Sequence, residues 1–584
     1  MTIILSTTSR CVPFLEHNDT TRCQMGCAQT RQAVTLLQPH VPYVRSGYEE
    51  QYLDYTSYCY RATYDGRVVH RDRWILIVKY DTDDPICPGE AISLGWTVAN
   101  RDGFDKRLIS TLNTGDTFTK GTLLARHPSI SPDGFLRLGK NLMTTFISCP
   151  YNYKDAIAIS ETCAKKMAIR YVHSHEMIFE DDAPIVWIND TIGHPQGTFV
   201  KKADPIFVIK PKNPLFISSV THPGKVIRMP VSGCLFWDVE VDCVLKTPKE
   251  IAAYDAIYDK QIDDATRVGA AIDFVFGADP YMADAYKRRY MGHAGDRRNG
   301  SCIVLRYWIV EEVDIQRGSK LSNRHGNKGV VSVIFPDKDA PHTEHGEVVD
   351  VILNPMSIPS RRNVGQLFEL HITRAMNKTF NKAMVCDTLD ERKALVGNFL
   401  QKVQHPRLTE LFMQQFNEDM WNDMVHAQGF QMISRPFESY SYETLLQTCH
   451  ESGLGPDLKE PVTFGGQTIN AAIGYNYWYR LEHEPFKKIF GRSVGAYGRI
   501  GQPIRGSNAH RLGELEIWAL LAHQAYENIV EMMVPKSDNM TETARMLKAL
   551  HDGHADLYSP HDTTVGAMRL MKIYLQAAGY DCTE

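Results

Sequence analysis

The most distinctive chemistry in the sequence lies in a short basic segment, GSKLSNRHGNKGVVSVI, at residues 318–334. It places Lys320, Arg324, His325 and Lys328 within nine residues, among glycine and asparagine residues that are typical of a turn. Glycine lets a backbone approach a ligand closely, and lysine carries a mobile positive charge that suits phosphate. The segment predicts a phosphate-binding turn between two strands, although composition alone would also fit a solvated basic turn.

Other candidate residues lie in three further polar segments. They are Arg22, Arg31 and Gln32 in VPFLEHNDTTRCQMGCAQTRQAV (12–34), Asp155 in PYNYKDAIAIS (150–160) and Arg361 in NPMSIPSRRNVGQ (354–366). Taken singly, the first segment is typical of a polar turn and the second of the start of a tyrosine-rich strand. Only their combination with the basic turn gives them functional meaning.

The sequence shows no pattern of a structural metal site or a disulfide framework. Its thirteen cysteines contain no C-x-x-C pair. Cys23 with Cys27 and His551 with His554 are the closest suggestive pairs, but neither has a second pair to complete four ligands. We therefore expect free thiols and a surface histidine pair.

Length and composition set the outer bounds. At 584 residues the chain has room for three or four domains of about 150 residues each. It has no run of 18 apolar residues and no signal-peptide pattern at its start, so we expect a cytoplasmic protein with no membrane partner. The net charge of -5 does not exclude nucleic-acid binding, because phosphate binding depends on a local basic surface.

The apolar pattern divides the chain into a β-rich first half and a helical last third. Short β-branched and aromatic runs predict strands at 73–80, 91–98, 122–127, 155–160, 184–189, 204–210, 224–229, 234–246 and 301–315. Apolar residues at helical spacing predict helices at 246–292, 364–380, 390–403 and 512–533. In the last of these, Leu515, Trp518, Ala519 and Ala522 predict a buried face.

Together, these segments resemble the β-type (second-largest) subunit of multisubunit DNA-dependent RNA polymerase. The basic turn is similar to the family segment G-D-K-x-x-x-R-H-G-x-K-G. Residues 344–371 are similar to the block D-I-V-L-N-P-x-x-V-P-S-R-M-N-I-G-Q-x-x-E that follows it. Residues 12–34, 138–161 and 501–538 resemble further blocks of the family in the same order. Two long adjacent blocks in the right order make a chance resemblance negligible.

The resemblance implies roles for individual residues. Those implied in catalysis are Lys320, Arg361 and Asp155, and those implied to bind the phosphates of a nucleoside triphosphate are Arg22, Lys320 and Arg361. Those implied to contact RNA or the hybrid are Arg31, Gln32, Arg324, His325 and Lys328.

The cofactor implied by the resemblance is Mg²⁺, held mainly by the β′-type partner. The N-A-D-F-D-G-D triad of that partner has no counterpart here, because the nearest string, DTDD at residues 81–84, lacks the alternating aspartates and is typical of a turn. No residue of this chain is therefore expected to hold the catalytic metal directly. Asp155 is the one candidate for an outer-shell contact to a second magnesium.

The resemblance also implies a mixed α+β, multidomain fold built on a double-psi β-barrel. The implied divisions are 1–164 (hybrid-binding region and first part of the barrel core), 165–299 (flap-like insertion), 300–372 (second part of the barrel), 373–498 (mixed helical region of the hybrid-binding core) and 499–584 (C-terminal clamp or anchor helices).

The sequence departs from the family pattern at several positions. Lys154 replaces the glutamate of an acidic pair, Ser319 replaces an aspartate, and acidic residues stand where bacterial relatives carry a second lysine before the basic turn. This divergence, and a start just upstream of VPFLEH, predict a split β subunit like those of large bacteriophages. The expected partners are a polypeptide with the N-terminal half of β, β′-type chains, DNA template, RNA transcript, nucleoside triphosphates and a promoter-specificity factor.

The implied function is templated nucleotidyl transfer by an assembly, with this chain inactive alone. A non-catalytic nucleic-acid-binding or virion structural protein that kept the fold is one alternative, but it would not need Arg22, Lys320 and Arg361. A self-sufficient single-chain polymerase is another, but it would need an aspartate triad.

Overall fold

The protein is described from a computed structural model, which describes residues 5–54, 58–95, 103–180, 185–187, 197–209, 225–241, 252–290, 302–489, 491, 496, 504, 512–554, 560 and 566–581. The chain forms two compact units, Met1–Pro485 and Phe486–Glu584. The expected boundaries at 299 and 498, and most of residues 499–511, lie outside the described residues.

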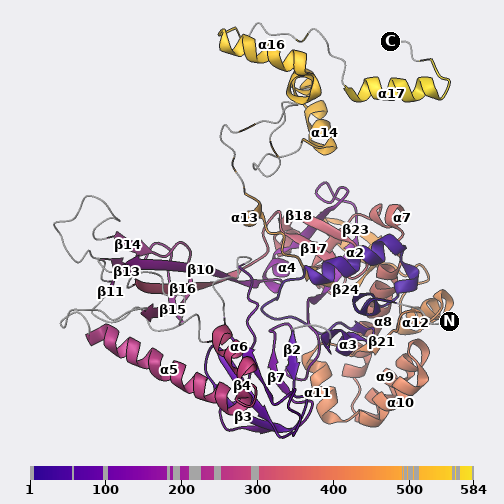
Figure 1. Ribbon diagram of the computed structural model, residues 1–584. Helices are drawn as coiled ribbons and strands as arrows, with labels where there is room; N and C mark the ends of the chain where they lie inside the picture. The colour runs from indigo at the N-terminus through magenta and orange to yellow at the C-terminus, as the bar shows by residue number, and fades with distance from the viewer. Residues whose placement is uncertain are drawn as a thin grey trace. The chain divides into compact units, whose positions relative to one another are not determined.

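A closed six-stranded barrel lies within the first unit (Figure 1). Its strands follow the order β17 (Lys320–Asn323), β18 (Lys328–Phe335), β9 (Ala156–Ser160), β20 (Val351–Leu353), β8 (Lys140–Phe146) and β24 (Ile473–Arg480). The pairs β18–β9 and β20–β8 are parallel, and the other pairs are antiparallel. Met143, Ala158, Val333 and Ile352 pack together in one apolar core. The barrel therefore joins strands from segments far apart in the sequence.

Two helices carry much of the candidate site on the barrel. Asp19 caps the start of helix α2 (Thr20–Arg31), and its carboxylate accepts a hydrogen bond from the Thr21 amide. Helix α8 (Gly365–Met384) packs along β24, where the Thr373 hydroxyl exchanges hydrogen bonds with the Tyr475 backbone.

Helix α8 also anchors a helical region. Its apolar side, with Phe368, Ile372 and Phe380, shares a core with α9 (Leu389–Val403), α11 (Glu418–His426) and α12 (Tyr442–Ser452). Helix α10 (Pro406–Gln415) packs on α9.

Two long paired strands lie at the two ends of the segment expected to form a flap, one at its start and one just after it. Strand β10 (Ile169–Glu180) pairs antiparallel with β16 (Cys302–Val313) along its whole length. Strands β15 (Gly233–Val241) and β12 (Thr198–Val200) extend this sheet, and β11 (Ile185–Trp187), β13 (Pro205–Ile209) and β14 (Lys225–Arg228) form another.

The first helix of the same segment contacts both β15 and an earlier sheet. Helix α5 (Ala252–Phe276) is followed by α6 (Pro280–Tyr290), and its residues Ile272 and Val275 pack against Ile75 and Ile77 of β4 (Ile75–Tyr80). Strand β4 belongs to a sheet with β5 (Gly89–Ser93), β3 (Gly66–Arg71) and β6 (Thr117–Phe118). The helical part of the expected flap thus shares a core with an earlier sheet.

In the second unit, one sequence prediction is wrong. Residues 512–533 form two helices, α14 (Glu514–Ala522) and α15 (Tyr526–Met533), separated near Gln524, whose φ is +55°. The residues expected on a buried face are exposed, with Leu515 at 53% and Trp518 at 41%. Helical periodicity identifies an apolar face but does not supply the surface that covers it. A π-helical turn (Val534–Asp538) and helices α16 (Met540–His551) and α17 (Gly566–Ala577) follow in the described part of this unit.

The prediction of a mixed α+β, multidomain fold is confirmed. Among the helices that the structure describes, none is both long and apolar enough to cross a membrane.

Candidate functional site

The basic turn forms a hairpin of the barrel. In the register of β17 and β18, Lys320 lies opposite Val330 and Ser322 lies opposite Lys328. Residues directly opposite each other in an antiparallel pair share one face of the sheet, as do residues two apart on one strand. Lys320 and Lys328 therefore lie on the same face as Ser322, whose hydroxyl donates a hydrogen bond to the Gln29 side chain of α2.

Two glycines allow α2 to approach the turn closely. A Cβ atom on Gly26 of α2 would lie 2.3 Å from the Arg324 carbonyl oxygen. A Cβ atom on Gly326 would lie 2.3 Å from the Arg22 carbonyl oxygen, and Gly326 has a φ of +72°. Only glycine fits these positions without displacing backbone, and the contact fixes Arg22 beside the turn.

Arg22, Arg361 and Asp155 converge near the N-terminal end of α2. The Arg22 guanidinium donates a hydrogen bond to the Gly326 carbonyl at 3.4 Å. Arg361, the last residue of α7 (Ser357–Arg361), forms an ion pair with Asp155 and donates to the Asn327 side-chain oxygen at 3.0 Å. Burial, and then the nearby Arg22, lower the pKa of the Arg361 guanidinium. The cluster thus holds two guanidinium groups close enough to repel each other, with one carboxylate paired to Arg361.

The other end of α2 carries a second group of candidates. Arg31 is exposed at the last turn, about 14 Å along the helix axis from Arg22. The carbonyl of Gln32 accepts from the Glu482 amide, and the neighbouring Leu481 amide donates to the Lys320 carbonyl. Lys320 therefore lies near this end. We call Arg22, Arg31, Lys320, Lys328 and Arg361 the basic strip.

Asp155 does not form a metal site by itself in this conformation. Its side chain is 59% exposed and paired with Arg361, and it follows Lys154, whose φ is +56°. In the part of the chain that the structure describes, no three His, Cys, Asp or Glu side chains are grouped so as to hold a metal ion. Among the described residues, Asp155 and its neighbours do not fit a directly bound magnesium ion.

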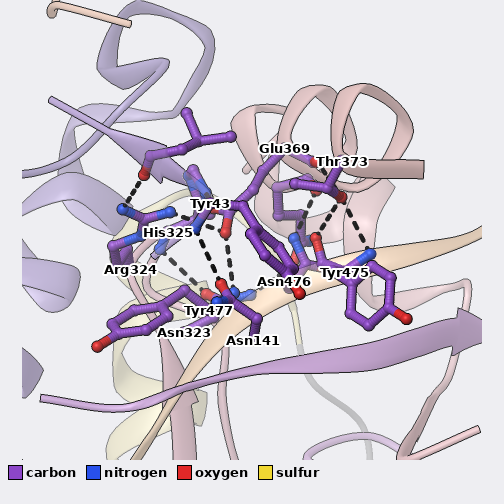
Figure 2. A network of polar contacts seen from close by, with 12 residues as sticks. Tyr43, Asn141, Asn323, Arg324, His325, Glu369, Thr373, Tyr475, Asn476 and Tyr477 are labelled. Atoms are coloured by element: carbon purple, nitrogen blue, oxygen red, sulfur yellow. Dashed lines mark hydrogen bonds and ion pairs between the residues drawn. The ribbon is translucent and has the colours of Figure 1, made fainter. Parts of the chain in front are cut away.

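Arg324 and His325 require a correction. Both side chains are buried, and both bind the carboxylate of Glu369 in α8, at 2.8 Å from Arg324 and 2.6 Å from His325 (Figure 2). Arg324 also donates to the Val44 carbonyl at 2.7 Å. Both side chains are therefore enclosed in the protein and turned toward Glu369, which leaves neither of them at a surface that RNA could contact.

Electrostatics explains why this buried cluster is tolerated. Burial alone would raise the pKa of Glu369, but Arg324 and His325 more than offset that effect and hold it at about 2. Burial lowers the pKa of His325, and Glu369 opposes this effect only in part. Glu369 also accepts from the Tyr477 amide at 2.8 Å. The cluster therefore attaches the basic turn to α8 and β24 inside the protein.

A chain of side-chain amides lies next to this cluster. Gln366 of α8 accepts from Asn323 at 3.0 Å and from Asn327 at 3.1 Å, and donates to Asn363 at 2.9 Å. The Asn323 side chain accepts from the amides of His325 and Asn327, which shapes the turn.

Sequence reasoning assigned no role to Asn327, Asn363, Gln366 or Glu369. All four lie within the blocks that resemble the family. Their polar side chains, in segments expected to form strands and helices, were the one feature of the sequence that could have indicated a structural role.

The fold and site define a multidomain α+β protein built on a closed barrel with the basic strip along α2 and the hairpin. The chain belongs to the family RNA polymerase Rpb2, domain 6, whose model matches residues 8–509. The protein named DNA-directed RNA polymerase subunit beta from Streptococcus suis (strain 05ZYH33) is 26% identical over 593 residues, covering 99% of this chain and 43% of the relative. The protein of the same name from Listeria welshimeri serovar 6b is 26% identical over 604 residues, covering 99% and 44%.

The predicted resemblance to the C-terminal half of the β subunit is thereby confirmed. The chain spans less than half the length of these relatives.

Proposed function

We propose that this chain is a subunit of a DNA-directed RNA polymerase that contacts the nucleoside triphosphate and the RNA 3′ end during templated nucleotidyl transfer. The observation that carries the proposal is the convergence of Arg22 and Arg361 beside the basic turn, with Asp155 as the ion-pair partner of Arg361. Two close guanidinium groups with one carboxylate leave an excess of positive charge, which suits a triphosphate. An incoming phosphate would take the place of Asp155 on Arg361.

Each residue of the basic strip has a distinct role in this proposal. Nucleotidyl transfer needs an aligned RNA 3′ hydroxyl, two magnesium ions and cations that neutralise the triphosphate. Arg22, Lys320 and Arg361 neutralise the phosphates, while Lys328, Arg31 and Gln32 contact the RNA end. Arg324 and His325 act indirectly, by holding the turn through Glu369.

Magnesium is assigned to the β′-type partner. Asp155 is paired with Arg361 and follows a lysine, so its contribution to the second magnesium is an outer-shell contact through water. The double-psi crossing of the barrel strands and the flap role of residues 165–299 are parts of the same proposal.

The assembly contains further components. They are a polypeptide with the N-terminal half of β, β′-type chains, DNA template, RNA transcript and a promoter-specificity factor. The differences at Lys154 and Ser319 support a divergent lineage, and the proposal includes a split β subunit like those of large bacteriophages, acting in the host cytoplasm. The competing function is a non-catalytic nucleic-acid-binding or virion structural protein.

Alanine substitutions in the reconstituted complex test the proposal. A charge-assisted contact to phosphate contributes about 1.5–3 kcal/mol, so Lys320→Ala and Arg361→Ala should each slow nucleotide addition by roughly 10- to 150-fold. Arg361→Lys should recover only part of the loss, because lysine lacks the planar fork of arginine. Losses below about threefold in both alanine variants would mean that these residues do not lie in the nucleotide path.

A further inference from the structure

The Arg361 guanidinium is held from two sides, and one of these contacts has no role in the function proposed above. Asp155 binds one terminal nitrogen of the guanidinium, and the side-chain oxygen of Asn327 accepts from the other at 3.0 Å. Asp155 is more than half exposed, whereas Asn327 is buried at 3% exposure. The buried contact is the one that an incoming phosphate cannot replace.

The orientation of the Asn327 amide is fixed by its surroundings. Its NH₂ group donates to the Gln366 side-chain oxygen, which can only accept, and its backbone amide donates to the Asn323 side chain. Gln366 is itself fully buried and donates to Asn363. With its nitrogen so engaged, Asn327 can offer only its oxygen to Arg361.

We propose that Asn327 is a positioning residue that aims Arg361 at the phosphates of the incoming nucleotide, through the amide chain anchored on α8. The inference rests on the proposed function of Arg361 and extends it to a residue that does not itself contact substrate. When Asp155 releases Arg361 to a phosphate, Asn327 keeps one nitrogen of the guanidinium in place. The arginine side chain is then ordered before the nucleotide binds, and this lowers the entropic cost of nucleotide binding.

The test is single-nucleotide extension on a primer-template scaffold by the complex of this chain with its partner polypeptides. Asn327→Ala removes one of the two contacts of Arg361, so we expect KM for the nucleoside triphosphate to rise about tenfold, with kcat changed less than about threefold. In an Arg361→Ala background the same substitution should have no further effect, because the group that it positions is absent.

Asn476→Ala is the matched control. Asn476 is another buried asparagine bound to Gln366, through the Gln366 carbonyl at 2.9 Å, and a general loosening of α8 would act through it as well. Its effect should add to that of Arg361→Ala. If Asn327→Ala adds to Arg361→Ala in the same way, the positioning role is overturned.

Asn327→Asp keeps the size of the side chain and its contact with Arg361 but loses the hydrogen bond to Gln366, so size-exclusion chromatography of each variant complex is used to show that it assembles. This substitution places a second carboxylate on Arg361, which competes with phosphate, and should raise KM more than tenfold only while Arg361 is present. A KM within about twofold of wild type overturns the inference. An Arg361→Ala variant with wild-type KM would overturn the proposed function itself, and the inference with it.

Discussion

The substitution Glu369→Gln should destabilise the first unit strongly, although it changes few atoms. The carboxylate binds Arg324 and His325 in the interior, and the glutamine keeps the shape but loses the charge. Arg324 would then remain buried without an anionic partner. Removing one member of a buried ion pair costs about 3–5 kcal/mol.

The low pKa of Glu369 corresponds to a free energy of the same order. Its fall from 4.5 to about 2 corresponds to about 3 kcal/mol of stability at neutral pH. Because the pKa is lower in the folded state, this contribution is present above about pH 4.5. It is lost as the pH falls from there through about 2.

Urea unfolding of the full chain, followed by circular dichroism, measures the effect. We expect a free energy of unfolding lower by about 3 kcal/mol for Glu369→Gln at pH 7, and a difference from wild type that shrinks below about pH 4. Glu410→Gln, on the exposed side of α10, is the matched control and should change stability by less than about 0.5 kcal/mol. Equal unfolding curves for the two variants would refute the assignment of a charged buried cluster.

Two further predictions concern the surroundings of the basic turn. Asp155→Asn should slow nucleotide addition by about tenfold or less and raise the magnesium requirement, whereas Lys154→Glu should lower the magnesium requirement. Superimposable magnesium titrations of single-nucleotide extension for wild type and both variants would place this pair outside the reach of the metal. Gly326→Ala should lower the melting temperature more than Gly346→Ala. Both glycines have positive φ, but only at Gly326 would the added Cβ lie within 3 Å of a backbone atom. Equal melting temperatures of the two variants would show that α2 does not pack tightly on the turn.

Local sequence patterns predicted individual elements well. The helix expected at 390–403 is α9, whose start is fixed by the capping box of Thr388 and Glu391, and the strand expected at 155–160 is β9. These elements depend on neighbouring residues alone. The closed barrel depends on pairing between strands near residues 140, 320 and 475, and no local pattern encodes such pairing.

The candidate site was predicted in part, for a similar physical reason. The sequence identified Arg22 and Arg361, which lie in different blocks and converge in the structure. Arg324 and His325 were also expected to face a ligand. A residue's type reveals its charge but does not reveal the partner that neutralises this charge. That partner, Glu369, lies 45 residues after Arg324 and 44 residues after His325, in another segment of the resemblance, where the sequence assigned it no role.

The proposed function requires that this chain supply nucleotide and RNA contacts to a polymerase whose catalytic metal site lies on a partner. The decisive measurement is templated RNA synthesis by the purified chain, by the partner polypeptides, and by both together. We predict synthesis only in the mixture, and its loss by roughly 10- to 150-fold when Arg361→Ala replaces the wild-type chain. Robust templated synthesis by the chain alone, or by the partners without it, would contradict the account.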